Sequence, residues 1–111
     1  MISQELGGKR LRVRFSGEID HYAAERLRGQ IETAIGSHAQ VCELLLDFSD
    51  VSFMDSSGVG MIIGRYKTMR ARGGKVTACS MRPNVEKLFR LAGLHRIIAV
   101  TDGSEGVKCS E

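Results

Sequence analysis

The sequence lacks several patterns that would point directly to a function. Its three cysteines form no CxxC pair, and no group of His, Cys, Asp and Glu residues has metal-ligand spacing. No apolar run approaches the length that spans a membrane, and the N-terminus lacks the basic-then-apolar layout of a signal peptide. We therefore expect reduced cysteines and a cytoplasmic protein with no metal, no cofactor and no membrane association.

Catalytic motifs are missing as well. No serine lies in a GxSxG sequence, and no GK[ST] follows the glycines at 58, 60 and 64. Among the three histidines only His21 is expected near Ser57, and a Ser–His pair without an oxyanion site makes a poor hydrolase. We expect no enzyme and no catalytic residues. A small hydrolase with Ser57 as nucleophile is the alternative that a covalent serine probe would test.

The charge of the chain is modest and unevenly distributed. Residues 1–50 carry 6 basic and 8 acidic side chains and residues 51–111 carry 10 and 5, for a net charge of +3. The basic residues that follow Ser57 have almost no aromatic residues between them, which gives little support to single-strand binding. We expect a solvated basic face and no nucleic-acid partner, although this half could also meet an acidic protein surface. These basic residues are Arg65, Lys67, Arg70 and Arg72.

The hydrophobic patterns predict a single α/β domain over residues 1–111. Residues 11–15 alternate strictly and would form a hairpin with a strand around residues 2–6. Residues 16–20 are expected to be a loop, and helices and strands then alternate, which favours a mixed, mainly parallel sheet with helices packed on it. The further strands are expected at 41–48, 75–79 and 97–100, and the helices, ended by Gly36, Gly73 and Gly93, begin near Asp20, Ser57 and Pro83. A weak helical piece after Asp102 completes the prediction.

The most informative stretch runs from Asp47 to Gly64. After a short polar turn, Asp55, Ser56 and Ser57 stand directly before a helical pattern, where their side-chain oxygens can cap the first turn. Two serine hydroxyls then lie at the positive end of a helix dipole, which stabilises phosphate. The apolar face of this helix is expected to consist of Val59, Ile62, Ile63, Tyr66 and Met69.

The early glycines of this helix leave two interpretations open. Each costs about 1 kcal/mol against alanine in a helix, so each must allow a close approach of the backbone. The close neighbour is either the adjacent strand or a docked partner. A nucleotide-sensing role is compatible with the helix start, but no motif indicates one.

Motifs along nearly the whole chain resemble the STAS domain of anti-sigma factor antagonists. The resemblance extends to about Val100 and is strongest for the sporulation type, the antagonists of the anti-sigma-F factor. The DSSG turn between a strand and a helix is its most specific part. The matching segments are Ser16–Asp20, Leu46–Phe48, Phe53–Gly60, Gly64–Tyr66, Gly73–Gly74, Pro83 and Phe89–Leu94.

The resemblance implies a switch between partners. The unphosphorylated antagonist would bind an anti-sigma factor, which is a kinase, and free the sigma factor that it holds. The kinase would use ATP to phosphorylate the serine before the glycine of the DSSG turn, here Ser57, and a serine phosphatase would restore binding. Residue physics alone does not choose between Ser56 and Ser57.

The surface for the partner is expected around this turn. Ile62 and Ile63 are expected to belong mainly to the core. The alternative is a STAS module of another system, such as stress signalling, a transport accessory protein or an anion transporter, not controlled at Ser57. The expected partner-binding residues are Asp20, His21, Asp55, Ser56, Ser57, Gly58, Val59 and Met61.

Overall fold

The chain opens with the hairpin that its alternating residues predict. In the computed structural model, which describes residues 2–101, strand β1 (Ile2–Gly7) pairs antiparallel with β2 (Arg10–Ile19). The apolar side chains of β2, at positions 11, 13 and 15, are buried, while Arg12 and Arg14 lie on the opposite face of the sheet. The hairpin therefore gives one edge of the sheet an apolar face and a polar face.

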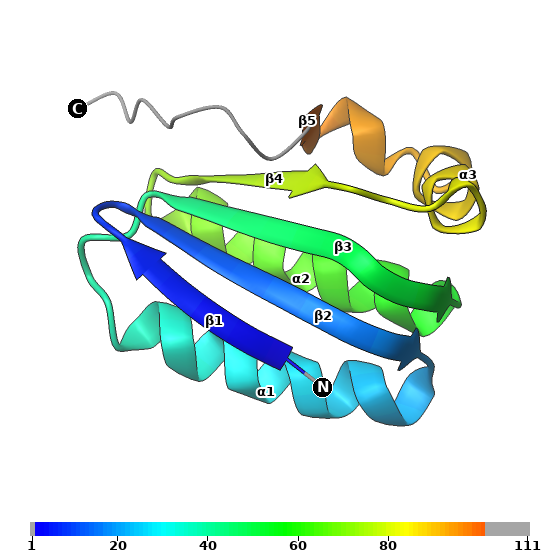
Figure 1. Ribbon diagram of the computed structural model, residues 1–111. Helices are drawn as coiled ribbons and strands as arrows, with labels where there is room; N and C mark the ends of the chain where they lie inside the picture. The colour runs from blue at the N-terminus through cyan, green and yellow to red at the C-terminus, as the bar shows by residue number, and fades with distance from the viewer. Residues whose placement is uncertain (1, 102–111) are drawn as a thin grey trace.

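The remaining strands join this hairpin in the order of the chain. Strands β3 (Glu43–Met54), β4 (Lys75–Cys79) and β5 (Ala99–Thr101) follow β2, each parallel to its neighbour, and the sheet order is β1-β2-β3-β4-β5 (Figure 1). This arrangement confirms the prediction of a mixed, mainly parallel sheet with an opening hairpin.

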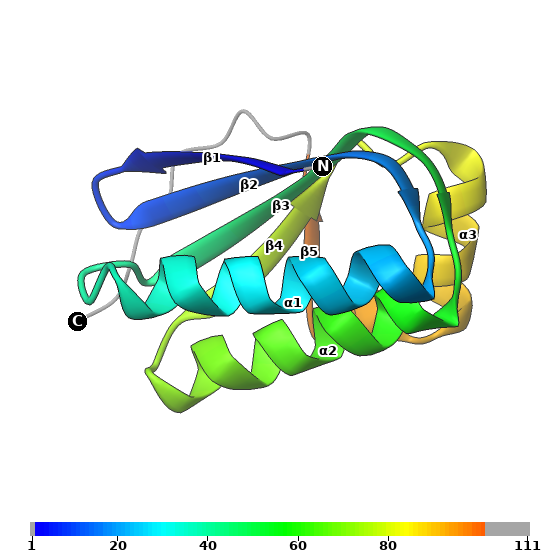
Figure 2. The ribbon, with the colours of Figure 1, turned by 90° about the horizontal axis from the view of Figure 1, so that it is seen from below.

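The helices cover the sheet unequally. Helix α1 (His21–Gly36) and helix α2 (Ser56–Ala71) lie side by side on one face, whereas α3 (Pro83–Leu91) lies beyond the end of β4 (Figures 1 and 2). A short 3₁₀ helix, η1 (Leu94–Arg96), leads from α3 toward β5. The main core therefore lies between the sheet and the α1–α2 pair.

This core is aliphatic with a small aromatic centre. The rings of Phe15 and Phe48, on neighbouring strands, lie 5.2 Å apart between their centroids, and both side chains are buried. Ile31 of α1 and Ile62 of α2 are fully buried against the sheet. Since burying one such side chain contributes roughly 1.5–3 kcal/mol, this layer holds both helices, and with them their N-termini, in fixed positions.

Strands β2 and β3 continue further than the sequence predicts. Residues 16–19 were expected to be a loop and residues 49–52 a turn, and both expectations are wrong. The two segments pair with each other through a register that shifts twice, for example Ser16 with Asp50 and Glu18 with Phe53. The Asn84 side chain also donates to the Ser52 carbonyl oxygen at 2.9 Å. Pairing between distant segments thus makes strands of residues whose own composition favours a turn.

Helix ends agree with the prediction in part. Gly73 has a φ of +77°, a conformation that favours glycine, and it ends α2 as expected. Gly36 is instead the last residue of α1, and Ser37 caps the helix while its hydroxyl donates to the Thr33 carbonyl oxygen at 2.8 Å. The helix therefore ends at Gly36 as predicted, but Gly36 does not have the positive φ of a glycine cap. The helical piece expected after Asp102 lies outside the described residues.

The cysteines also differ from expectation. Cys79 is a free, buried thiol at the end of β4, and burial raises its pKa. Cys42 takes part in a disulfide, so the expectation of a reduced thiol is wrong for this residue.

Asp47 connects β3 to β2 on the sheet face opposite α1 and α2. Its carboxylate lies 2.6 Å from the Arg12 guanidinium and accepts from the Ser49 N–H at 2.9 Å, with only 1% of the residue exposed. Burial alone would raise the pKa of this carboxyl. The hydrogen bonds from Arg12 and Ser49 outweigh burial and hold the pKa below its usual value.

We expect Asp47→Asn to lower the free energy of unfolding by about 1–2 kcal/mol at pH 7, since charge-assisted hydrogen bonds are lost. A carboxyl whose pKa is lowered by folding stabilises the protein above its unfolded pKa of about 3.9, and this stabilisation is lost as the pH falls through the folded pKa. Urea unfolding between pH 7 and pH 2.5 should therefore show that the free energy of unfolding falls less steeply with decreasing pH (a flatter acid slope) for the variant.

Asp50→Asn is the matched control, because Asp50 is exposed and pairs with the exposed Arg14 at 3.5 Å. It should keep nearly the wild-type stability and acid slope. Equal losses in the two variants, or an unchanged acid slope in Asp47→Asn, would show that the buried carboxylate does not contribute in this way.

Candidate functional site

The candidate site is built where β2 and β3 end. The last paired residues of these parallel strands are followed directly by Asp20 and Asp55, each of which is the N-cap of a helix. The Asp20 carboxylate accepts from the Ala23 N–H at 2.9 Å, and the Asp55 carboxylate accepts from the Ser57 N–H at 2.8 Å. Both predicted caps are confirmed.

The two helix starts are held together. The Asp55 N–H donates to the Ile19 carbonyl oxygen at 3.2 Å and so connects the start of α2 to the end of β2. Figure 2 shows α1 and α2 running next to each other, both starting at the end of the sheet where β2 and β3 finish. The positive ends of two helix dipoles therefore lie at one edge of the sheet, where parallel strands present their carboxyl ends.

A shallow pocket of about 250 Å³ lies between the first turns of α1 and α2. Ser57 is half-buried and forms part of its wall, whereas Ser56 is exposed and does not line it. The pocket combines a hydroxyl with side chains of both charges, in a place that another protein can reach. Its lining residues are His21, Ala24, Glu25 and Arg28 of α1 and Ser57, Gly60 and Met61 of α2.

The residues predicted for partner binding gather here but differ in exposure. His21 and Ser56 are exposed, while Asp20, Asp55 and Val59 are half-buried. Gly58 and Met61 are buried, so they lie beneath this surface and do not project from it. The structure therefore brings the eight predicted positions together at the start of α2 and the neighbouring turn of α1.

Gly58 and Gly60 have different surroundings, although they are two residues apart. A Cβ atom at Gly58 would lie 2.4 Å from Met54 Cγ and 3.1 Å from Ile19 Cγ2. A Cβ atom at Gly60 would meet no atom within 4 Å. Close packing onto the neighbouring strands accounts for Gly58, and the chain itself gives no such reason for Gly60.

The buried face of α2 is rotated from the predicted one. Ile62 and Met69 are buried as expected, but Val59, Ile63 and Tyr66 are only partly buried. Arg65 was expected on a solvated basic face, and this is wrong because only 6% of it is exposed. The face that packs inward contains Gly58, Met61, Ile62, Arg65 and Met69.

Arg65 is buried because α1 supplies an acidic partner. Its Nε atom lies 2.6 Å from the Glu32 carboxylate, which also accepts from the Thr68 hydroxyl at 2.7 Å. This cluster joins the middle of α1 to the second half of α2. It fixes how the two helices lie against each other and therefore how their N-termini meet at the pocket.

Several residues around the pocket are not among the predicted site residues. Glu25 and Arg28 lie four and seven positions after His21, a spacing that returns to the same face of a helix and could have indicated them. Tyr22 lies in the first turn of α1 and Phe53 near the end of β3, and they are 75% and 45% exposed. Exposed aromatic side chains are common in protein interfaces, so these two residues are further candidates for contact with a partner.

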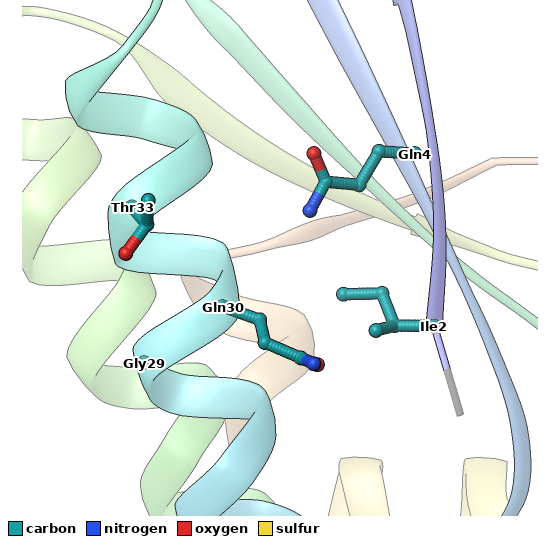
Figure 3. Close-up of a pocket in the computed structure, with 5 residues that line it drawn as sticks. All are labelled: Ile2, Gln4, Gly29, Gln30 and Thr33. Carbon is teal, nitrogen blue, oxygen red and sulfur yellow. The ribbon is translucent and has the colours of Figure 1, made fainter.

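A wider hollow of about 530 Å³ lies on the other side of α1, between this helix and β1. Figure 3 shows the Gln4 and Ile2 side chains of β1 pointing toward α1, with Gln30 reaching toward them from the helix. Gly29 and Thr33 complete the lining, which contains no charged side chain. The Ser57 pocket is smaller, but its lining contains charged side chains and a serine hydroxyl.

Residues 2–101 show neither a membrane-spanning helix nor a metal site. No helix within this range has both the length and the apolar character needed to cross a membrane. No group of three or more His, Cys, Asp and Glu side chains there is arranged to hold a metal ion.

Comparison with known proteins identifies the family. Residues 4–106 match the family model of the STAS domain, so the chain belongs to the STAS domain family. The anti-sigma F factor antagonist of Paenibacillus polymyxa is 40% identical over 91 residues, which cover 81% of this chain and 76% of that protein. The anti-sigma-B factor antagonist of Bacillus subtilis is 34% identical over 96 residues, which cover 86% and 85%.

Solved structures agree with this assignment. The unphosphorylated form of the anti-sigma factor antagonist SpoIIAA has a TM-score of 0.79 at 33% identity, covering 91% of this chain and 88% of that one. The phosphorylated form of SpoIIAA, a Bacillus cell fate determinant, has a TM-score of 0.71 at 32% identity, with 91% of each chain covered. The resemblance to the STAS domain of anti-sigma factor antagonists is therefore confirmed.

Proposed function

We propose that this protein is an anti-sigma factor antagonist of the sporulation type that is switched by phosphorylation of Ser57. The unphosphorylated chain binds an anti-sigma factor, itself a serine kinase, and frees the sigma factor that the kinase held. Phosphorylation by that kinase with ATP ends the binding, and a serine phosphatase restores it. The observation that carries the proposal is the position of Ser57, accessible in a charged pocket at the start of α2.

The choice of Ser57 over Ser56 follows from the surroundings of the two hydroxyls. Ser57 lines the pocket, and its backbone N–H is held by the Asp55 carboxylate at 2.8 Å, so its position is defined. Ser56 is exposed at the first position of the helix and lines no part of that pocket. A kinase that docks on this surface would find the Ser57 backbone held in one position at the pocket wall.

The proposed docking surface consists of exposed residues that pack on buried ones. His21 and Ser56 supply exposed contacts, and Asp20, Asp55 and Val59 border them. Gly58 and Met61 hold this layer in place from below. Tyr22 and Phe53 extend the surface with aromatic area, which commonly anchors protein partners.

Electrostatics explain how one modification can end the binding. A phosphoserine carries a charge of roughly −1.5 to −2. The start of α2 tolerates this charge because the helix dipole favours an anion there. A partner that presents acidic groups would be repelled, since opposed like charges in an interface cost several kcal/mol. The switch then requires no refolding of the antagonist.

We propose that the chain is a regulatory protein, not an enzyme, with the STAS domain spanning residues 1–111. It needs no cofactor or metal of its own, and its partners are the kinase and the phosphatase, with no nucleic acid and no membrane. We place it in the cytoplasm, because a sigma factor and its regulators act where transcription takes place.

The experiment is phosphorylation by the anti-sigma factor kinase of the same organism, with labelled ATP and localisation of the phosphate by fragmentation mass spectrometry. The wild type and Ser56→Ala should each take up one phosphate, and Ser57→Ala none. If Ser57→Ala still took up phosphate, Ser57 would not be the acceptor. Absence of both uptake and binding in the wild type would favour a STAS module of another system.

A further inference from the structure

The pocket beside Ser57 contains the charged groups that a phosphate on this residue would meet. From α1 these are His21, Glu25 and Arg28, while the α2 residues of the lining carry no charge. The two capping carboxylates nearby are both engaged, Asp20 with the Ala23 N–H and Asp55 with the Ser57 N–H. Arg28 is the permanent cation of the pocket.

Arg28 is held only weakly in the unmodified chain. Its guanidinium lies 3.2 Å from the Glu25 carboxylate, one turn earlier in the same helix, and the two side chains are 55% and 61% exposed. Exposed pairs at this spacing contribute little to stability, because water screens them and both side chains lose freedom. A stronger anion in the same pocket could therefore take Arg28 from Glu25.

We propose that a phosphate on Ser57 is bound within the chain by Arg28, with His21 as a second donor, and that Arg28 leaves Glu25 to reach it. This inference rests on the proposed function, because it requires the modification at Ser57. Phosphate offers three acceptor oxygens and about twice the charge of a carboxylate, and guanidinium groups bind it in a bidentate manner. The pocket has room, since its 250 Å³ corresponds to several water molecules of about 30 Å³ each.

If Arg28 exchanged Glu25 for the phosphate, phosphorylation on α2 would also change the charge presented by α1. In the unmodified chain Arg28 and Glu25 neutralise each other on the surface that faces the partner. In the phosphorylated chain Arg28 is neutralised by the phosphate and Glu25 is released as a free carboxylate. The partner then meets new negative charge on both helices, although only one serine is modified.

The experiment uses the full chain with phosphoserine incorporated at position 57 during synthesis, so that no kinase is needed. Titration by ³¹P NMR gives the second pKa of the phosphate, which is near 6 in an unperturbed phosphoserine. Arg28→Gln should raise this pKa by about half a unit or more, because a nearby cation favours the dianion, and Glu25→Gln should lower it.

Arg26→Gln is the matched control, since Arg26 is an exposed residue of the same helix and does not line the pocket. It removes the same charge and should move the phosphate pKa by less than about 0.2 units, because separated surface charges are screened. Equal shifts in the two arginine variants, or none in Arg28→Gln, would overturn the inference. A phosphorylated chain that still bound the anti-sigma factor would instead overturn the proposed function, whatever the titration showed.

Discussion

Ser57→Asp is expected to bind the anti-sigma factor at least about 100-fold more weakly than the wild type, whereas Ser57→Ala should bind it even with ATP and active kinase present. Opposed like charges in an interface cost several kcal/mol, and each 1.4 kcal/mol is a tenfold change in affinity. The alanine variant offers no hydroxyl to the kinase and cannot be switched off. Isothermal titration calorimetry with the purified anti-sigma factor measures both variants.

The stability of the same variants separates a charge effect from misfolding. An aspartate in the first turn of α2 lies at the positive end of the helix dipole, so Ser57→Asp should be as stable as the wild type or up to about 1 kcal/mol more stable. Ser56→Asp adds the same charge at the exposed neighbour, outside the pocket, and should weaken binding less. Normal binding by Ser57→Asp would mean that charge at this position is not the switch.

The parts of the fold that the sequence predicts are those decided by local chemistry. Asp20 and Asp55 precede helical patterns and have side chains that accept from backbone N–H groups, so their capping follows from neighbouring residues alone. Strand β4 matches its predicted bounds of 75–79 because three of its five residues are apolar and glycines precede it. Such features need no knowledge of what packs against them.

The parts that were wrong depend on contacts between distant segments. Three of residues 49–52 are polar and the segment resembles a turn, but it becomes strand because the end of β2 pairs with it and Asn84 donates to the Ser52 carbonyl oxygen. Arg65 resembles a surface residue, but it is buried because α1 places Glu32 within 2.6 Å of it. Periodicity in one helix cannot show which charge the neighbouring helix will present.

In the site, too, local features could be predicted and features that depend on distant contacts could not. The DSSG turn could be found in the sequence, and the resemblance to a family gave it a function. Arg28 was missed because its importance comes from lying across the pocket from Ser57, on a different helix. Whether Gly58 and Gly60 serve packing or a partner was also left open, since both stand in the same sequence context.

Alanine at these two glycines should change the stability of the protein in opposite directions. Gly60→Ala should raise the free energy of unfolding by up to about 1 kcal/mol, because alanine favours the helix and its Cβ meets no atom within 4 Å. Gly58→Ala should lower it by about 2 kcal/mol, because its Cβ would lie 2.4 Å from Met54 Cγ, whose side chain is itself buried. Overpacking of this kind typically costs 1–3 kcal/mol, which outweighs the gain in helix propensity.

Binding by the two alanine variants tests whether Gly60 serves the partner. Gly60 lines the Ser57 pocket and is exposed, so a methyl group there would project into the docking surface without disturbing the fold. We expect Gly60→Ala to be more stable than the wild type and yet to bind the anti-sigma factor more weakly. Urea unfolding and calorimetry on the same preparations give both quantities. If Gly60→Ala bound as well as the wild type, the partner would not approach this turn of α2 closely, and the docking surface would have to lie nearer Tyr22 and Phe53.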